Sequence, residues 1–379
     1  MFLGLLKETK VTDLSILFQP IAIGSLTLKN RLAMAPMTRI SAEENGCATE
    51  QMAANYARYA AGNFGLVICE ANYVDQHYSQ GYHFQPGLAT TEQADSWRPV
   101  VDAIHANGAK ACMQLVHAGA LNQGRRESYP QGAIAPSAFQ PIGEMLPFYR
   151  GEGQYDAPRE ITADEIVAVK ASFADAAKRA VAVGFDAIEI HGANGYLLDQ
   201  FFTAYTNQRT DEYGGEVRNR IRLDEEITRE VIAAIGGAVP VGVRLSQSKV
   251  NDYEYTWPGG EDDAAVVFPV LEAAGAAYIH ITEHVAVADA FHSGTTLAGL
   301  AKKYLSIPVI VNGGLGEPEL AASVIADGNG DIIALGKSAL ANHDWPNKVQ
   351  AGGALDEFDF GMLSPIADLN NAEVWAANR

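Results

Sequence analysis

The chain has 379 residues, of which 48% are hydrophobic, so it is long enough for one large domain or two ordinary ones with an ample core. Its 46 acidic and 27 basic residues give a formal net charge of −19. This excess of negative charge disfavours nucleic acid and anionic membrane surfaces as partners, because both attract basic patches. No apolar run approaches the roughly 18 residues of a membrane-spanning helix, and the first residues lack the basic region and cleavage site of a signal peptide.

The number and spacing of the cysteines narrow the possible classes of protein further. The three cysteines, Cys47, Cys69 and Cys112, form no CxxC pair, so the sequence predicts neither a cysteine-ligated iron–sulfur cluster nor a zinc ribbon. This usage fits a reducing, cytoplasmic setting. No metal site is predicted, because the histidines form no HExxH pair and no acidic residue joins them at ligand spacing.

Strands and helices are predicted to alternate eight times. Short apolar runs rich in valine and isoleucine are followed by segments of helical period. The predicted strands are 32–37, 66–71, 111–116, 187–191, 241–245, 278–282, 309–311 and 332–335. The predicted helices are 50–61, 97–106, 163–183, 217–235, 264–274, 296–305, one that starts at Glu317-Pro318, and 345–350. This pattern predicts a (β/α)₈ TIM barrel that fills residues 1–379 as a single domain. A doubly wound sheet is disfavoured because no strand leads into a GxGxxG loop.

Two excursions interrupt this alternation. Residues 18–30 alternate apolar and polar side chains like a hairpin, which would cap the bottom of the barrel. Residues 121–160 interrupt the third unit and are rich in glycine, proline, tyrosine and glutamine. An insertion after a barrel strand lies on the face where barrel active sites form, which predicts a lid-like segment facing the substrate. An excursion without a function is the alternative.

Three hydrogen-bond donors stand together where the fourth predicted strand ends. His191, Asn194 and Tyr196 fall within six residues at the end of the apolar run 187–191. A buried strand needs no such donors, whereas a site that holds a carbonyl oxygen and delivers a proton beside it needs them all. In a barrel the carboxyl ends of all strands face one mouth, so polar residues after the other strands are expected to join them.

Polar residues on other strands predict a site for an anion or a cofactor. Gln114 and Arg244 interrupt apolar runs, and a buried arginine is costly unless it meets an anion or a polarised oxygen. A structural ion pair is the alternative for Arg244, and a core amide explains Gln114 as well as a ligand role does. The last two strands end in glycine turns, where barrels often hold a phosphate; glycines that only permit tight turns are the alternative. These turns contain Gly313, Gly314, Gly336 and Lys337.

In combination, the motifs of this chain resemble those of the old yellow enzyme family, the FMN-dependent ene-reductases. The resemblance extends from Leu17 to Gly352, with the motifs in barrel order. They are KNRLAMAPMTR at 29–39, MQLVHAG at 113–119, HGANGYLLDQFF at 191–202, TNQRTDEYGG at 206–215, NRIRLDEEI at 219–227, GVRLS at 242–246, and the NGG and LGK turns.

The resemblance implies bound FMN, with NADPH or NADH as electron donor and an activated alkene as substrate, in a ping-pong cycle. Thr38 would donate to flavin O4, which makes this the threonine type of the family. His191 and Asn194 would bind the oxygen of an activating carbonyl or nitro group, and Tyr196 would protonate the alkene. The implied cofactor residues are Pro36, Met37 and Thr38 along the isoalloxazine, Ala71 at its edge, Gln114 and Arg244 at the pyrimidine, and Gly313, Gly314, Gly336 and Lys337 at the phosphate.

Three positions depart from the family pattern. Lys337 stands where arginine is usual, which keeps the charge but loses the bidentate geometry, so we expect weaker FMN binding. Val116 stands where an aromatic residue is common, so we expect a more open pocket. Asp199 stands where asparagine often occurs, and nothing in the sequence explains that change.

The alternative function is a flavin-free barrel that acts on a phosphorylated small molecule as an aldolase or isomerase. Its Schiff base would need a lysine at a strand end, and Lys337 is the candidate. The sequence leaves open the physiological substrate among enones, maleimides and nitroalkenes, the choice between NADH and NADPH, and the choice between monomer and homodimer.

Overall fold

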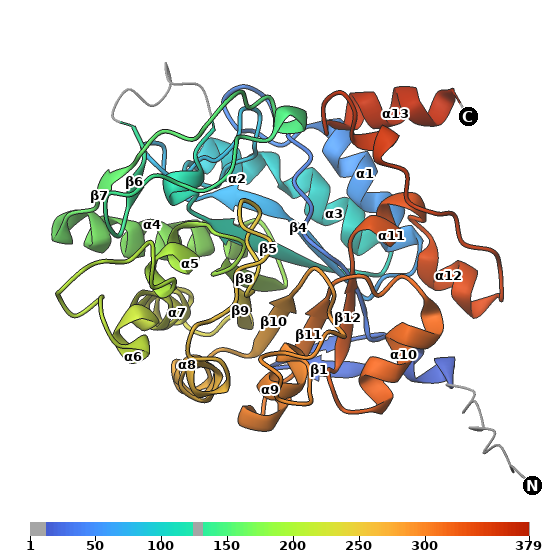
Figure 1. Cartoon of the computed structure of the whole chain (residues 1–379). Helices are drawn as coiled ribbons and strands as arrows, with labels where there is room; N and C mark the ends of the chain where they lie inside the picture. The colour runs from blue at the N-terminus through green and yellow to red at the C-terminus, as the bar shows by residue number, and fades with distance from the viewer. Residues whose placement is uncertain (1–12, 124–131, 379) are drawn as a thin grey trace, which may run out of the picture.

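The computed structural model of the chain describes residues 13–123 and 132–378. Eight parallel strands close a barrel in the order β10-β11-β12-β3-β4-β5-β8-β9, and helices surround it (Figure 1), which confirms the predicted (β/α)₈ architecture. Residues 1–12, for which we expect no signal peptide, and residues 124–131 of the predicted excursion lie outside the described part. In the described part, no helix has the length and apolar character needed to cross a membrane.

The elements lie close to their predicted positions. The barrel strands are β3 (Leu32–Met34), β4 (Leu66–Tyr73), β5 (Lys110–Val116), β8 (Ala187–His191), β9 (Val241–Leu245), β10 (Tyr278–Thr282), β11 (Val309–Asn312) and β12 (Ile332–Leu335). The helices are α1 (Glu50–Ala61), α2 (Thr91–Ser96), α3 (Arg98–Ala106), α4 (Ala163–Ala182), α5 (Leu197–Phe202), α6 (Val217–Arg220), α7 (Arg222–Ile235), α8 (Glu261–Ala273), α9 (Leu297–Tyr304), α10 (Pro318–Ala326), α11 (Lys337–Ala341), α12 (Trp345–Gln350) and α13 (Leu369–Ala377).

Two boundaries differ from the prediction for local reasons. The first barrel strand ends at Met34 rather than Met37, because Pro36 has no N–H with which to continue the ladder. The predicted helix 217–235 is divided at Ile221, whose φ of −82° and ψ of −3° tighten the backbone between α6 and α7. The pattern also gave no sign of α2, which is short and polar, or of α13, in which Leu369 is the one buried residue.

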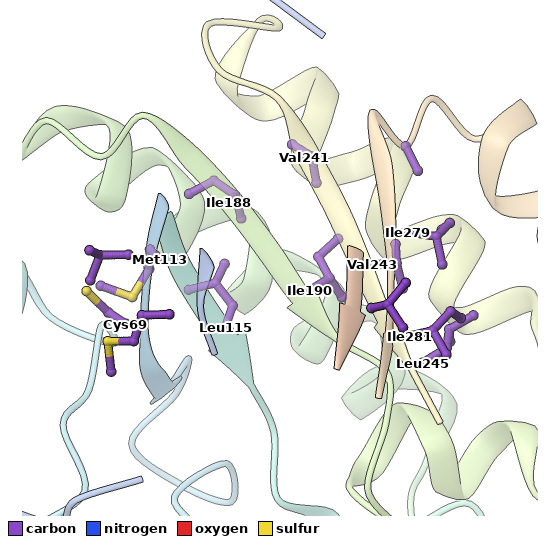
Figure 2. Packing of buried hydrophobic residues seen from close by; sticks show 14 of the residues in the cluster. Cys69, Met113, Leu115, Ile188, Ile190, Val241, Val243, Leu245, Ile279 and Ile281 are labelled. Atoms are coloured by element: carbon purple, nitrogen blue, oxygen red, sulfur yellow. The ribbon is translucent and has the colours of Figure 1, made fainter. Parts of the chain in front are cut away.

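Strand residues that point outward form the larger core, between the barrel and its helices. Figure 2 shows Met113 on β5, Ile188 on β8, Val243 on β9 and Ile281 on β10 within this layer. Because parallel barrel strands are buried on both faces, they are near-continuous apolar runs. That property made them recognisable in the sequence.

Inward-pointing residues fill the amino-terminal half of the barrel with a second apolar core. The hairpin of β1 (Ile21–Ile23) and β2 (Leu26–Leu28) contributes Ile23 and Leu28, both fully buried, to this cluster. Burial of each of these side chains is worth about 1.5–3 kcal/mol. The hairpin therefore closes this end of the barrel and leaves the carboxyl-terminal end for the site. The barrel residues of the cluster are Ala33, Ala35, Leu66, Ile68, Cys112, Ala187, Tyr278, Ile310, Ile332 and Ala334.

The described part of the excursion after β5 returns to the barrel mouth. It contains β6 (Ile134–Ala135) and β7 (Arg159–Glu160), which pair in parallel, and the 3₁₀ turn Pro147–Tyr149. The Tyr149 ring lies 4.6 Å from the ring of Tyr82, and its hydroxyl donates to the carbonyl oxygen of Thr38 at 3.2 Å. This segment forms part of a wall around the mouth.

Candidate active site

A cavity of ≈ 430 Å³ opens at the carboxyl-terminal end of the barrel. Every cofactor and catalytic residue that the sequence singles out contributes to its wall, because the carboxyl ends of parallel strands meet at one face. These residues are Pro36, Met37, Thr38, Ala71, Gln114, His191, Asn194, Tyr196, Arg244, Gly313, Gly314, Gly336 and Lys337.

His191 ends β8 and presents a neutral imidazole to the cavity. Its Nδ1 accepts a hydrogen bond from the backbone N–H of Ala193 at 3.3 Å, which assigns the ring proton to Nε2. Burial lowers the pKa of His191 well below its ordinary value, and the positive charge of Arg244 lowers it further. The side chain is therefore a neutral donor, suited to an oxygen on which negative charge develops.

Asn194 is held in a left-handed backbone conformation, with φ of 62°, which asparagine tolerates better than most residues. Its backbone N–H donates to Ser246 Oγ at 2.9 Å, and its carbonyl oxygen accepts from the N–H of Val250 at 3.2 Å. Behind this loop, Asp199 Oδ1 and Lys249 Nζ form a fully buried ion pair at 2.7 Å. The ion pair gives Asp199 a structural partner and fixes the loop from which the Asn194 amide reaches the cavity.

The hydroxyl of Tyr196 lies 2.6 Å from the hydroxyl of Tyr82, and both tyrosines are buried. The Tyr82 loop is fixed by Gln85, whose Oε1 accepts from the N–H of Tyr82 and whose Nε2 donates to the carbonyl oxygen of Ala71. Burial raises the pKa of Tyr196, and the hydrogen bond from Tyr82 and the charge of Arg244 both oppose that rise. Sequence reasoning missed Tyr82, since its loop shows no periodic pattern.

The floor of the cavity contains a buried hydrogen-bonded chain of three side chains. Gln114 Nε2 donates to Glu189 Oε1 at 2.7 Å, and Glu189 Oε2 lies 2.8 Å from His280 Nδ1. Of these three residues, only Gln114 lines the cavity. Its amide group therefore bonds to a side chain rather than to the backbone, and its carbonyl oxygen is left for a ligand.

Arg244 is the buried cation of the site, with only 5% of its surface exposed. Its Nη2 donates to Thr282 Oγ1 and to Asn312 Oδ1, each at 3.1 Å, and both acceptors are neutral. Its Nε is buried without a hydrogen-bond partner among the described residues. A guanidinium in this state has capacity for a polar or anionic ligand, so the ion-pair alternative does not account for Arg244.

In the turns after β11 and β12, the fold requires glycine at one position, and two other glycines have open space beside the backbone. Gly313, with φ of 137°, passes so close to the carbonyl of Glu283 that no side chain would fit, so the fold itself requires glycine there. At Gly336 an added Cβ would meet only Met37 Sδ at 3.6 Å, and at Gly314 only a carbonyl oxygen at 3.8 Å. The space above these two glycines admits a ligand close to the backbone.

Lys337 lies beside aromatic side chains from the carboxyl-terminal segment. Its Nζ is 5.9 Å from the ring centre of Phe358 and 5.0 Å from that of Phe360, both within reach of a cation–π interaction. Phe358 also lines the cavity. Sequence reasoning missed this residue because it follows the last predicted helix.

Val116 is buried in one cluster with Tyr82 and Tyr196, which both line the cavity, but it is not itself among the lining residues. The expectation of a more open pocket therefore stays a prediction. Other cavity residues that the sequence did not single out for the site come mainly from loops. They include Tyr82, Leu146, Tyr149, Val250, Glu283, His284, Phe358 and Leu363.

Together, the fold and site define a TIM-barrel enzyme with a cofactor-sized cavity at its carboxyl-terminal face. A family model described as the NADH:flavin oxidoreductase / NADH oxidase family matches residues 16–356, which is most of the chain. The chain belongs to this family, the old yellow enzyme family, and is an FMN-dependent oxidoreductase that uses a nicotinamide electron donor.

Relatives and solved structures agree with this assignment. The chain is 33% identical to an NADH oxidase of Thermoanaerobacter brockii over 90% of its own length, and spans 52% of that longer protein. It is 34% identical to a probable flavin mononucleotide-dependent alkene reductase of Leishmania infantum, covering 92% of this chain and 93% of the relative. The old yellow enzyme homologue of Zymomonas mobilis superimposes with a TM-score of 0.81 at 33% identity, over 90% and 94% of the two chains. Morphinone reductase gives a TM-score of 0.82 at 30% identity, over 94% and 95%.

Proposed function

We propose that this enzyme is an NAD(P)H-dependent ene-reductase for C=C bonds activated by a carbonyl or nitro group, with enones, maleimides and nitroalkenes as substrates. The observation that carries the proposal is one cavity wall that combines a neutral His191 donor, a projecting Asn194 amide and a buried Tyr196 hydroxyl. When bound, FMN supplies the hydride, which it takes from NADH or NADPH in the same cavity in a ping-pong cycle.

The residues present fit FMN. The buried Nε of Arg244 lacks a partner among the described residues, Gln114 lines the cavity with its Nε2 bonded to Glu189, and Gly336 leaves open space. Arg244 would hold negative charge on the pyrimidine side, where a buried cation is most effective. The remaining contacts would come from Pro36, Met37, Thr38 and Ala71 along the ring and from Gly313, Gly314, Gly336 and Lys337 at the phosphate.

His191 and Asn194 would hold the substrate oxygen. Negative charge grows on that oxygen as the alkene accepts hydride, and fixed donors need no reorganisation to stabilise it. His191 remains neutral because of burial and the nearby Arg244, so its Nε2–H donates without forming a tight ion pair with the substrate. The backbone of Asn194 is held on both sides by hydrogen bonds, which fixes the point from which its side chain extends.

Tyr196 would deliver the proton to the second alkene carbon. For its own proton to point at the substrate, the Tyr196 oxygen must accept the hydrogen bond from Tyr82 at 2.6 Å. This arrangement stabilises the negative charge that remains on Tyr196 after proton transfer. Tyr82 thus acts as a positioning residue for the acid.

The structure gives the flavin-free alternative little support. A Schiff-base lysine must lose its proton to attack a carbonyl, and a low dielectric or a neighbouring cation usually assists that loss. Lys337 instead lies within cation–π reach of the Phe358 and Phe360 rings, and it begins α11 directly after Gly336. Its setting matches a charged group at the phosphate better than a nucleophile.

A visible absorption spectrum of the purified protein tests the proposal, followed by anaerobic addition of NADH and NADPH in separate cuvettes. We expect flavin bands that bleach with at least one nucleotide and return when 2-cyclohexenone is added. Absence of flavin bands, even after FMN is supplied, would overturn the cofactor assignment. Bleaching that no activated alkene reverses would overturn the ene-reductase proposal alone.

A further inference from the structure

The polar chain beneath the cavity is built into neighbouring strands of the barrel. Gln114 on β5 is the register partner of Glu189 on β8, and Arg244 on β9 is the register partner of both His191 on β8 and His280 on β10. Inward side chains of neighbouring strands meet near the barrel axis, which explains why residues so distant in sequence touch there.

Together, Gln114, Glu189, Arg244 and His280 contain one positive and one negative charge. Burial opposes ionisation of Glu189, but the hydrogen bonds from His280 and Gln114 and the charge of Arg244 hold its pKa below the ordinary value. Burial also lowers the pKa of His280, so the imidazole is neutral and its Nδ1–H donates to Glu189. Glu189 is therefore the counter-charge of Arg244, although the two form no direct ion pair within the described residues.

Glu189 and His280 do not line the cavity, so neither can touch a ligand there. They can act on one only through Gln114 and Arg244, which do line it. Glu189 occupies Gln114 Nε2 and thereby turns the Gln114 carbonyl oxygen toward the ligand. The negative charge of Glu189 also offsets part of the positive electrostatic potential that Arg244 creates in the cavity.

We propose that Glu189 is a positioning residue that sets the reduction potential of the bound cofactor below the value that Arg244 alone would impose. Reduction adds electrons to the ring, so a nearby cation stabilises the reduced form and an anion behind that cation opposes it. A lower potential favours hydride donation to the alkene. The inference rests on the proposed function only in that FMN lies against Gln114 and Arg244.

The energetics of burial support a functional reason for Glu189. Removing a carboxylate from water costs several kcal/mol, and apolar replacements of similar volume are often neutral or stabilising, as a general rule. The half of the barrel beneath it is filled with apolar side chains, which shows that the fold can close its interior without charge. A buried carboxylate whose partners reach the cavity is better explained by its field than by stability.

Glu189→Gln tests the proposal, with the midpoint potential of bound FMN measured by anaerobic spectroelectrochemistry. The new amide can still accept from Gln114 through its oxygen and can donate to His280 in the other tautomer, so the substitution removes mainly the charge. We expect a higher potential, by at least a tenfold change in the equilibrium between oxidised and reduced cofactor, which is about 30 mV for two electrons.

Asp224→Asn is the matched control. Asp224 on α7 is also fully buried, but both of its carboxyl oxygens lack a hydrogen-bond partner among the described residues, and burial raises its pKa well above the ordinary value. Burial favours the neutral form of Asp224, so we expect Asp224→Asn to leave the potential at the wild-type value. Fluorescence titration of each apoprotein with FMN gives a readout that is independent of turnover.

Three outcomes decide the matter. A raised potential in Glu189→Gln, with Asp224→Asn unchanged, supports the proposal. An unchanged or lowered potential in a Glu189→Gln protein that binds FMN overturns it. If Glu189→Gln does not fold, Glu189→Met removes the same charge with an apolar side chain of similar size and must show the same rise. Failure of the wild type to bind FMN would instead refute the proposed function, so the two failures are distinguishable.

Discussion

The two ends of the barrel interior differ in chemistry, although the same eight strands build both. The amino-terminal half is apolar, closed by Ile23 and Leu28 of the hairpin. The carboxyl-terminal half buries Gln114, Glu189 and Arg244 and opens into the cavity above them. Apolar burial stabilises a fold and buried polar groups cost free energy, so the first half supports the structure and the second supports chemistry.

This difference between the two halves leads to a general expectation for substitutions in each of them. Substitutions in the apolar half should change the free energy of unfolding and leave the half-reactions alone. Substitutions in the polar half should change one half-reaction at nearly constant stability.

The double substitution His191→Ala with Asn194→Ala should have the largest effect. It removes both donors to the substrate oxygen, and loss of even one such donor typically slows a reaction by about 10²–10³-fold. We expect phenol, whose oxygen would bind to these two donors beside the flavin, to give a charge-transfer band in an optical titration of the wild type and none in the double variant. FMN content should stay at the wild-type level, since neither residue is a proposed cofactor contact. Unchanged phenol affinity would contradict the assignment of the oxygen site.

Leu28→Ala tests the apolar half. The side chain is fully buried in the barrel floor, so its truncation should lower the free energy of unfolding by about 2–5 kcal/mol. Chemical denaturation measures this change, and Thr27→Ala, at an exposed position of the same hairpin, should shift stability by less than about 0.5 kcal/mol. Slower half-reactions in a folded Leu28→Ala protein would break the proposed separation between the two halves.

Tyr82→Phe should have a smaller effect that depends on pH. Tyr196 must carry its proton to act as an acid, so the rate of alkene reduction should fall as pH rises through the Tyr196 pKa. Removing the Tyr82 donor raises that pKa, which moves the falling limb of the profile to higher pH. The lost hydrogen bond, worth about 0.5–1.5 kcal/mol, should also slow the step about two- to tenfold near neutral pH. If the falling limb of the pH–rate profile stays at the wild-type pH, Tyr82 does not influence the pKa of Tyr196.

The sequence predicts most of the barrel because its strands are continuous Val- and Ile-rich runs. It also predicts the strand-end part of the site, because parallel strands bring their carboxyl ends together whatever the loops do. It does not predict Tyr82, Tyr149 or Phe358, whose positions depend on contacts between loops far apart in the chain, such as Tyr149 with Thr38. Nor does it reveal that Glu189 supports Gln114, because only the strand register places them side by side.

The central claim is that Tyr196 delivers the proton to an alkene held in this cavity. Stopped-flow measurement of both half-reactions in Tyr196→Phe tests it most directly. The account predicts bleaching of the flavin by NADH or NADPH at the wild-type rate, and reoxidation by 2-cyclohexenone slowed by about 10²-fold or more, as loss of a general acid typically causes. Reoxidation at the wild-type rate with formation of cyclohexanone would contradict it.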